Sequence, residues 1–350
     1  MDYTLLIYVF GAFLASLVTQ YLVIDLSHKK GIFIDDHTLD LPQKLHSEPT
    51  PRIGGLGIFV SILFMARDLE LGLYIILCII PAFLSGFLED LFAKISPLRR
   101  LLIMSVSGFM AIYLIDAVVL DFGIFHVPYV VGVLITMVAI LGLINGTNLI
   151  DGFNGLSSGV CFLIFATYFI VSLKVGDSGM AYISLVCMAS LLGFLLFNFP
   201  SGKIFLGDGG AYSLGFLLAV MSIMIVKRSM TRDDILDISP WFALVSLIYP
   251  VWEVIFSFTR RTLVHRQSPF HPDSKHFHQL IYRSIAKQNN PLTTIYIFPI
   301  VILFNTLAIY FYNNTTALIL ITLVFITCYT IFYFIYSRRE FSDNKANNLS

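Results

Sequence analysis

The chain has 350 residues, of which 57% are hydrophobic and 13% charged. A soluble domain is about 25% charged, so this composition excludes an ordinary globular protein, and its hydrophobicity excludes a disordered one. The 22 basic and 22 acidic residues cancel, so no net charge attracts nucleic acid. A mean hydropathy of +0.83 and an aromatic content of 15% indicate a protein that crosses a membrane several times.

Long apolar segments predict an all-α integral membrane protein. A spanning helix needs about 20 mostly apolar residues, and runs this continuous exclude a β-barrel, whose strands alternate over about 10 residues. We expect one transmembrane domain over 1–336 and a polar cytoplasmic tail over 337–350. The eleven predicted spans are 4–24, 53–66, 71–88, 101–115, 129–144, 157–173, 180–197, 210–226, 239–257, 292–312 and 316–336.

The basic residues predict the orientation of these spans. Eleven spans place the two termini on opposite sides of the membrane, and 17 of the 22 Lys and Arg residues fall in the loops of one side. Because cytoplasmic loops carry an excess of Lys and Arg, we expect an outer N-terminus and a cytoplasmic C-terminus in the inner (plasma) membrane. The cytoplasmic loops are 25–52, 89–100, 145–156, 198–209, 258–291 and 337–350.

The first cytoplasmic loop ends in a proline-rich run followed by two glycines. Proline prevents a regular helix there, and glycine allows a close approach of the backbone. Lys44, His46 and Arg52 are suited to face an anion. An ordinary basic loop beside the membrane explains the same residues, so this run alone favours no function.

Two adjacent carboxylates, Glu89 and Asp90, end the third predicted span. Carboxylates at the end of a membrane helix cost free energy unless they are paired or bind a metal. Lys94, Arg99 or a divalent ion can compensate them. A carboxylate pair exposed to water is an equally good interpretation.

Loop 145–156 carries the strongest pattern in the chain. Asn148, Asp151 and Asn154 are spaced by three residues, and the loop holds no Lys or Arg. On a helix these oxygen-bearing side chains share one face, and hard cations prefer such ligands. A plain turn also uses Asn and Gly, but the spacing and the apolar flanks favour a binding site.

A glycine-rich segment with Phe205 and Asp208 leads into the eighth predicted span. The N–H groups at a helix N-terminus bind phosphate, and a carboxylate beside that positive end is suited to hold a metal. Asp208 acting as a simple helix N-cap explains the same pattern.

The longest cytoplasmic loop is rich in Arg, Lys and His, and Arg266 and its basic neighbours suit anion binding. His276 and His278 diverge on a helix but align on extended backbone. With His271 or Asp273 as a third ligand they would suit zinc. Contact with anionic lipid headgroups is a further interpretation of the loop.

These five loops lie on one predicted membrane face, and the spans are nearly free of charge. Glu253, in the ninth span, is the exception and indicates function unless it reaches the interface. A transporter places polar groups at mid-bilayer and uses both faces. The pattern therefore favours an enzyme acting at the cytoplasmic face on a phosphorylated, metal-bound substrate. A transporter or flippase of lipid-linked or anionic substrates is the alternative.

The chain resembles the polyprenyl-phosphate N-acetylhexosamine-1-phosphate transferases, a family that includes the phospho-MurNAc-pentapeptide transferases. The resemblance lies in the runs at 49–55, 89–90, 145–156 and 205–210 and in the histidine loop. It implies transfer of N-acetylhexosamine-1-phosphate, here GlcNAc-1-phosphate, from a UDP-sugar to undecaprenyl phosphate. UMP is released, Mg²⁺ or Mn²⁺ is required, and the product starts an O-antigen, capsule or teichoic-acid type of glycan. Some relatives form dimers, so a homodimer is one expected assembly.

The same resemblance implies roles for individual residues. Glu89 stands where the family usually has Asp, and its longer side chain argues against direct metal binding by this residue. This departure also allows a third interpretation of the chain, as an assembly scaffold that does not turn over substrate. The order Lys275-His276-Phe277-His278 departs from the three consecutive histidines of the pentapeptide branch. The implied roles are metal ligation by Asn148 and Asp208, catalysis by Glu89, Asp90, Asp151, Asp208, His276 and His278, and uracil contact by Asn154 and Phe205. Asp90 can act as a base, as a metal ligand or in positioning the lipid phosphate. By their charge, Lys44, Arg99 and Arg100 are suited to neutralise diphosphate oxygens.

Overall fold

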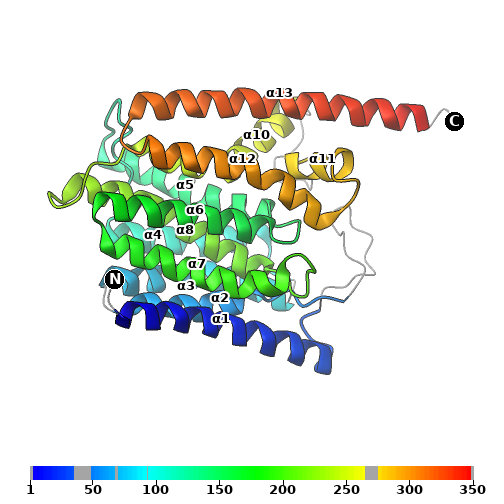
Figure 1. Ribbon diagram of the computed structural model, residues 1–350, viewed down its shortest axis with the longest axis horizontal. Coiled ribbons are helices and arrows are strands. Elements are labelled where there is room, and N and C mark those ends of the chain that lie inside the picture. The colour runs from blue at the N-terminus through cyan, green and yellow to red at the C-terminus, as the bar shows by residue number, and fades with distance from the viewer. Residues whose placement is uncertain (1–2, 35–48, 68–69, 93, 265–274, 348–350) are drawn as a thin grey trace.

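The computed structural model describes residues 3–34, 49–67, 70–92, 94–264 and 275–347. Every regular element in these ranges is a helix, which confirms the all-α prediction (Figure 1). The elements are α1 (Tyr3–Lys30), α2 (Gly55–Ile62), the 3₁₀ helix η1 (Leu63–Ala66), α3 (Glu70–Phe92), α4 (Pro97–Ile115), α5 (Tyr129–Leu149), α6 (Leu156–Val175), α7 (Ser178–Asn198), α8 (Gly207–Thr231), α9 (Pro240–Ser246), α10 (Ile248–Thr259), the π-helical turn η2 (Arg260–Val264), α11 (Phe277–Ser284), α12 (Asn290–Tyr310) and α13 (Thr315–Asn347).

Within the described ranges, nine helices are long and apolar enough to cross a membrane, which confirms a polytopic protein. Two of the eleven predicted spans have a different form. The segment 239–257 becomes α9 and α10, which meet at a 76° bend. The segment 53–66 becomes α2 and η1, a 12-residue unit of about 18 Å, shorter than the roughly 30 Å hydrocarbon core.

The chain runs back and forth between the two ends of the helix bundle (Figure 1). The end at which α8 begins is called the site end below. The last turns of α3 and α5 and the first turn of α4 meet the start of α8 there, because side chains from all three reach Asp208 or its neighbours. The described N-terminus and the C-terminal end of α13 lie at opposite ends of the bundle (Figure 1).

Helix α8 is the central element of the bundle. In its most apolar window, 94% of the residues are buried, against 22% for α1 and 28% for α13. Two glycines let the neighbouring helices approach its first turn closely. A Cβ atom on Gly86 of α3 would lie 2.3 Å from the backbone carbon of Asp208, and one on Gly55 of α2 would lie 2.2 Å from the nitrogen of Gly210. Glycine is therefore required at both positions.

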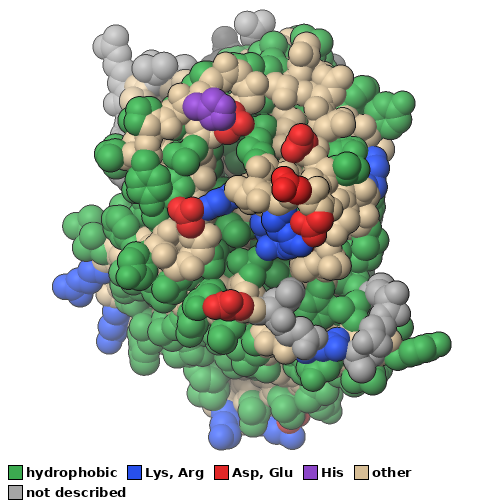
Figure 2. Space-filling view, turned by 90° about the vertical axis from the view of Figure 1, so that its left-hand side faces the viewer, with side chains coloured by type: hydrophobic (Ala, Val, Ile, Leu, Met, Phe, Trp, Pro, Cys, Tyr) green, Lys and Arg blue, Asp and Glu red, His purple; other side chains and the backbone are tan. Residues whose placement is uncertain are grey.

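Acidic and basic side chains are interspersed on the face at the end of the bundle opposite the site end (Figure 2). The basic side chains at the C-terminal end of α8 are paired there. Arg228 contacts the buried Asp177 at 2.6 Å, and Lys227 contacts Asp116. The third pair, Arg232 and Asp234, is exposed. These cations therefore act locally, within pairs.

Candidate active site

The first turn of α8 holds the carboxylate of Asp90. Asp90 Oδ1 accepts a hydrogen bond from the backbone N–H of Asp208, and Oδ2 accepts one from Gly209, both at 2.8 Å. The Asp90 side chain is 1% exposed. The N–H groups that the sequence predicts as a phosphate site are thus occupied by a carboxylate of the chain itself, which is the other anion such a helix start favours.

Asp208 lies at the centre of a polar cluster. Its Oδ1 accepts hydrogen bonds from Arg52 and from the Asn148 amide, each at 3.0 Å. Its Oδ2 accepts one from Arg100 at 2.9 Å, and the Tyr212 hydroxyl lies 3.4 Å away. The predicted pair of Asn148 and Asp208 is therefore in direct contact, and two arginines balance the carboxylate charges.

The turn after α5 brings Asp151 to the same cluster. Asp151 N–H donates to the Asn148 carbonyl at 3.1 Å, so the turn continues directly from the metal-ligand candidate. Burial raises the pKa of Asp151 to about 7, Arg52 opposes this rise, and Asp208 adds to it. Asp151 therefore changes charge close to neutral pH.

The acidic pair separates at the end of α3. Glu89 accepts a hydrogen bond from the Ile95 N–H at 2.9 Å and so supports the turn between α3 and α4. Asp90 alone reaches α8. The arginine pair separates in the same way, because Arg99 is exposed and Arg100 contacts Asp208. The structure thus joins Asp90 and Arg100 to the cluster and leaves Glu89 and Arg99 at its margin.

Asn154 and Phe205 lie on two loops that are tied together. The Asn154 amide donates to the Pro200 carbonyl at 2.9 Å, and Asn198 binds the Gly155 N–H at 2.6 Å. Phe205 is half-buried, and its N–H donates to the Pro51 carbonyl at 2.8 Å. The Asn154 side chain and the Phe205 backbone are therefore each held by hydrogen bonds to a neighbouring loop.

His276 and His278 lie side by side at the start of α11. Their rings stack with centroids 5.4 Å apart and planes within 7°. They align because His276 precedes the helix with an extended ψ of 154°, whereas His278 is inside it. Gln279 accepts a hydrogen bond from the His276 N–H at 3.1 Å. This arrangement is neither the helix nor the strand that the spacing suggests.

Glu253 faces both histidines. Its Oε2 lies 3.5 Å from His276 Nδ1 and its Oε1 lies 3.8 Å from His278 Nδ1. The Glu253 side chain is 1% exposed, so it is enclosed by protein and does not extend to the surface as a snorkelling side chain would. Burial lowers the pKa of His278 to about 3, against the opposing charge of Glu253, so His278 is neutral at physiological pH.

Three predicted binding residues, Lys44, His46 and Arg266, lie outside the described residues, as do His271 and Asp273 of the zinc alternative. Arg52 proves to be the central cation of the first loop. Its guanidinium lies 3.0 Å from Asp208 and 3.7 Å from Asp90. The sequence offered it only as one of three residues suited to face an anion. Of the two glycines that follow it, Gly55 packs against Gly210 of α8, and Gly54 packs against Phe194 of α7.

The donor atoms at Asp208 are of the kind that a hard cation prefers. Within the described ranges, no group of three or more His, Cys, Asp or Glu side chains is arranged to hold a metal ion. Mg²⁺, however, is usually held by one or two carboxylates together with substrate phosphates and water. The Asp208 carboxylate and the adjacent Asn148 amide fit that requirement. A bound ion would take the place of one of the side chains that now donate a hydrogen bond to Asp208.

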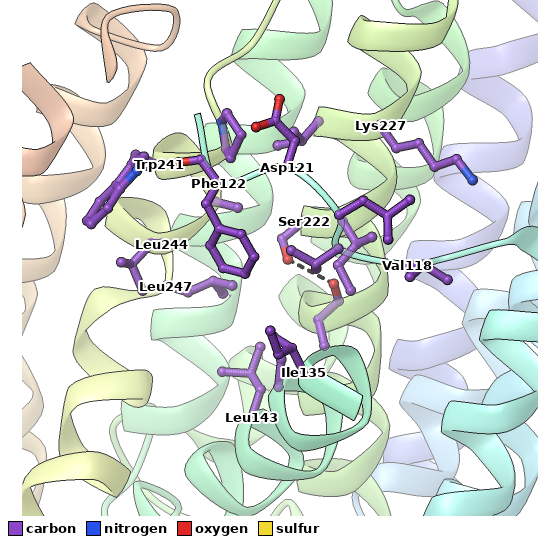
Figure 3. Close-up of a pocket in the computed structure, with 18 of the residues that line it drawn as sticks. Val118, Asp121, Phe122, Ile135, Leu143, Ser222, Lys227, Trp241, Leu244 and Leu247 are labelled. Carbon is purple, nitrogen blue, oxygen red and sulfur yellow. Dashed lines mark hydrogen bonds between the residues drawn. The ribbon is translucent and has the colours of Figure 1, made fainter. Parts of the chain in front are cut away.

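An apolar cavity of about 840 Å³ lies between α5, α8, α9 and α10. Phe122, Leu244, Leu247, Ile135 and Leu143 surround its open space (Figure 3). Its lining continues to Val251 and Val254 of α10. A Cβ atom on Gly146 would lie 3.0 Å from Val254, so the cavity ends close to the turn of α5 that bears Asn148.

Comparison with known proteins agrees with this geometry. The sequence model described as glycosyl transferase family 4 matches residues 72–226, which include Asp90, Asn148, Asp151 and Asp208. An undecaprenyl-phosphate alpha-N-acetylglucosaminyl 1-phosphate transferase of Thermotoga maritima is 31% identical over 71% of this chain and 74% of its own length.

Two further relatives are similar over comparable lengths. A probable undecaprenyl-phosphate N-acetylglucosaminyl 1-phosphate transferase of Bacillus subtilis is 30% identical over 76% of this chain and 75% of its own. A phospho-N-acetylmuramoyl-pentapeptide-transferase of Streptococcus thermophilus is 26% identical over 66% of this chain and 76% of its own. The polar cluster at the start of α8 therefore belongs to an enzyme fold, and the chain is a member of glycosyl transferase family 4.

Proposed function

We propose that the chain transfers GlcNAc-1-phosphate from UDP-GlcNAc to undecaprenyl phosphate and releases UMP. The observation that carries this proposal is the convergence of Asp90, Asn148 and Asp208, with two arginines, on the first turn of α8. Asp151 lies close enough to interact electrostatically with Arg52 and Asp208. The names of the two relatives that are at least 30% identical supply the undecaprenyl-phosphate acceptor and the N-acetylglucosaminyl phosphate group. The UDP donor and the UMP product come from the resemblance. The glycan built on this product stays a prediction from the resemblance.

The site end is proposed to face the cytoplasm of a bacterial cell, at its inner membrane. The loops that hold 17 of the 22 Lys and Arg residues include those that form the polar cluster, and basic loops favour the cytoplasmic side. If the short α2–η1 unit and the bent α9–α10 pair each carry the chain across once, the passes number eleven. The opposite ends of α1 and α13 (Figure 1) agree with that odd number.

The reaction needs positioning and charge neutralisation more than a strong base. A phosphate monoester has its second pKa near 6, so the lipid phosphate is largely ionised at neutral pH and can attack the diphosphate directly. Arg52 and Arg100 are placed to neutralise phosphate oxygens as the bond to UMP breaks. Mg²⁺ or Mn²⁺ at Asp208 and Asn148 would neutralise the diphosphate.

The apolar cavity is proposed to hold the first part of the polyprenyl chain. Its walls are apolar side chains such as Leu143 and Leu247, and it ends near the helical turn that bears Asn148. A lipid lying there would bring its phosphate to the polar cluster while its hydrocarbon avoids water. This arrangement accounts for a site placed at the end of a membrane bundle.

The test is UMP release by purified protein in nanodiscs with undecaprenyl phosphate and Mg²⁺. UDP-GlcNAc, UDP-GalNAc and 6-deoxy UDP-N-acetyl sugars are offered in parallel. We expect turnover with UDP-GlcNAc, its loss in EDTA, and at least a 100-fold loss in Asp208→Asn. The matched control is Glu70→Gln, because Glu70 is exposed at the start of α3, away from the cluster. A folded protein inactive with every donor would refute the proposal.

Two further measurements address the alternatives. A transporter would move substrate across the nanodisc or vesicle bilayer without releasing UMP, and Asp151→Asn and Asp208→Asn would leave that movement unchanged. Mass photometry of the nanodisc preparation would detect the homodimer that the resemblance raises.

A further inference from the structure

The contacts of Glu253 form a chain that ends in a cation. Glu253 Oε2 lies 3.5 Å from His276 Nδ1, and His276 Nε2 lies 3.2 Å from an Arg261 guanidinium nitrogen. A guanidinium only donates hydrogen bonds, so His276 Nε2 is the acceptor in this contact. The proton of neutral His276 is then on Nδ1, where it faces the carboxylate.

Glu253 also lies near the neighbouring ring, at a distance too long for a hydrogen bond. Its Oε1 lies 3.8 Å from His278 Nδ1, and the His278 ring meets the edge of Phe153 with centroids 5.7 Å apart. Phe153 belongs to the turn that bears Asp151. The carboxylate therefore has one histidine on each oxygen, and the stacked rings connect α10 to the turn between α5 and α6.

The last helix holds the same region in place. The Tyr333 hydroxyl donates to the Lys275 carbonyl at 3.0 Å and accepts from Arg260 at 2.5 Å. The ring of Tyr329 lies 4.8 Å from that of Phe277. These contacts lock the residues on both sides of His276, so the direction of its ring is set by α13 as well as by Glu253.

We infer that Glu253 is a positioning residue of the transferase, which acts through His276 to aim the Arg261 guanidinium at the diphosphate of the donor. This inference rests on the proposed function. A guanidinium matches phosphate oxygens with two parallel hydrogen bonds, provided that its plane is held. The assignment changes the role of His276: with its Nε2 accepting from Arg261, it orients a cation and does not act as the reaction's base.

Steady-state kinetics on four variants test this chain of contacts. Glu253→Gln removes the charge, and we expect kcat/KM for UDP-GlcNAc to fall about 10- to 100-fold, the size of loss seen when the outer partner of a metal-ligating histidine is removed. The loss should appear mainly in KM. His276→Gln should lose a similar amount, and the double variant should lose no more than His276→Gln alone. Arg261→Lys keeps the charge without the planar fork and should also raise KM.

Several results would overturn the inference. One is an unchanged KM in Glu253→Gln, and another is a double variant whose loss is the product of the two single losses. A third is an unchanged KM in Arg261→Lys. The Arg261→Lys variant tests the inference even if Glu253→Gln fails to fold. The control Glu70→Gln makes the same chemical change at an exposed position and should match the wild type. An inactive wild type would instead refute the proposed function.

A readout independent of turnover is the tautomer of His276. Nitrogen-15 NMR of histidine-labelled protein in nanodiscs distinguishes the two ring nitrogens, and the spectrum of His276→Gln assigns the signal. We expect a neutral ring protonated on Nδ1. A ring protonated on Nε2 alone would contradict the chain of contacts even in an active enzyme.

Discussion

Asp90 and Asp208 are joined through the backbone and not through their carboxylates: Asp90 Oδ1 accepts the N–H of Asp208 at 2.8 Å. The Asp208 side chain is thereby left to the arginines and Asn148. Two carboxylates of one site thus have different tasks. Asp90 anchors the first turn of α8, and Asp208 presents its oxygens to cations.

The first prediction separates the members of the acidic pair. Asp90→Asn leaves one amide oxygen for two backbone N–H groups, so one of them faces an NH₂ group. We expect the free energy of unfolding to fall by about 1–3 kcal/mol and kcat to fall at least tenfold, because the start of α8 shifts. Thermal unfolding and UMP release measure the two effects.

Glu89→Gln is the matched variant for that experiment. The Gln oxygen can still accept the Ile95 N–H that Glu89 binds, so activity should stay within about twofold of the wild type, because the contact is kept and the site cluster is untouched. If Glu89→Gln proved as damaging as Asp90→Asn, the separation of the pair would be wrong and Glu89 would belong in the site.

The second prediction separates the arginine pair. Arg100 lies 2.9 Å from Asp208, whereas Arg99 is exposed. Arg100→Gln removes a charge from the cluster, and we expect kcat/KM for UMP release to fall at least 30-fold, which corresponds to about 2 kcal/mol. Arg99→Gln should fall less than threefold. Equal losses would mean that both arginines meet the substrate.

These pairs show where inference from the sequence ends. Composition and apolar runs predict the helical bundle, and the order of loops along the chain brings Asn148 and Asp208 to one face. Adjacent helical residues differ by about 100° in direction, so the sequence could not say whether Arg99 or Arg100 turns inward. That choice depends on how closely α4 packs against α8.

The partner of Glu253 was hidden for a related reason. Glu253 and the histidines are more than 20 residues apart, and only the bend between α9 and α10 and the position of α11 bring them together. The short α2–η1 unit was also missed as such, since hydropathy registers apolar residues but not how deep in the bundle a helix begins. The sequence signal there was Gly55, where glycine allows a close backbone approach and where the structure brings Gly210 of α8 near.

The third prediction concerns pH and Asp151. Burial raises its pKa to about 7, so activity that needs the ionised carboxylate should increase as pH rises through about 7. The variant Asp151→Asn should be weaker and should lose that limb of the profile. A wild-type profile that is flat between pH 6 and 8 would contradict this assignment of Asp151.

The raised pKa also fixes the sign of a stability effect. The folded chain keeps the Asp151 proton more tightly than the unfolded chain does, so its neutral form stabilises the fold fully below about pH 4. That contribution is lost as pH rises to about 7. The melting temperature of Asp151→Asn minus that of the wild type should therefore rise between pH 5 and 8. A value of this difference that falls as pH rises would contradict the predicted sign.

The fourth prediction concerns the opposite end of the bundle, where stability and activity should separate. Asp177 is 2% exposed and receives two hydrogen bonds from Arg228, at 2.6 and 2.9 Å. Asp177→Asn leaves the guanidinium without its counter-charge, which costs about 3 kcal/mol when a buried pair is broken.

We expect a lower melting temperature in Asp177→Asn, with kcat of the folded fraction within twofold of the wild type, because the site end is untouched. Asp234→Asn is the matched control, since its pair with Arg232 is exposed and should leave the melting temperature unchanged. Surface ion pairs contribute little, whereas the Asp177 carboxylate also accepts the Met180 N–H that begins α7. Equal effects of the two substitutions would show that burial of Asp177 contributes nothing, and a loss of kcat would show that the two ends of the bundle are coupled.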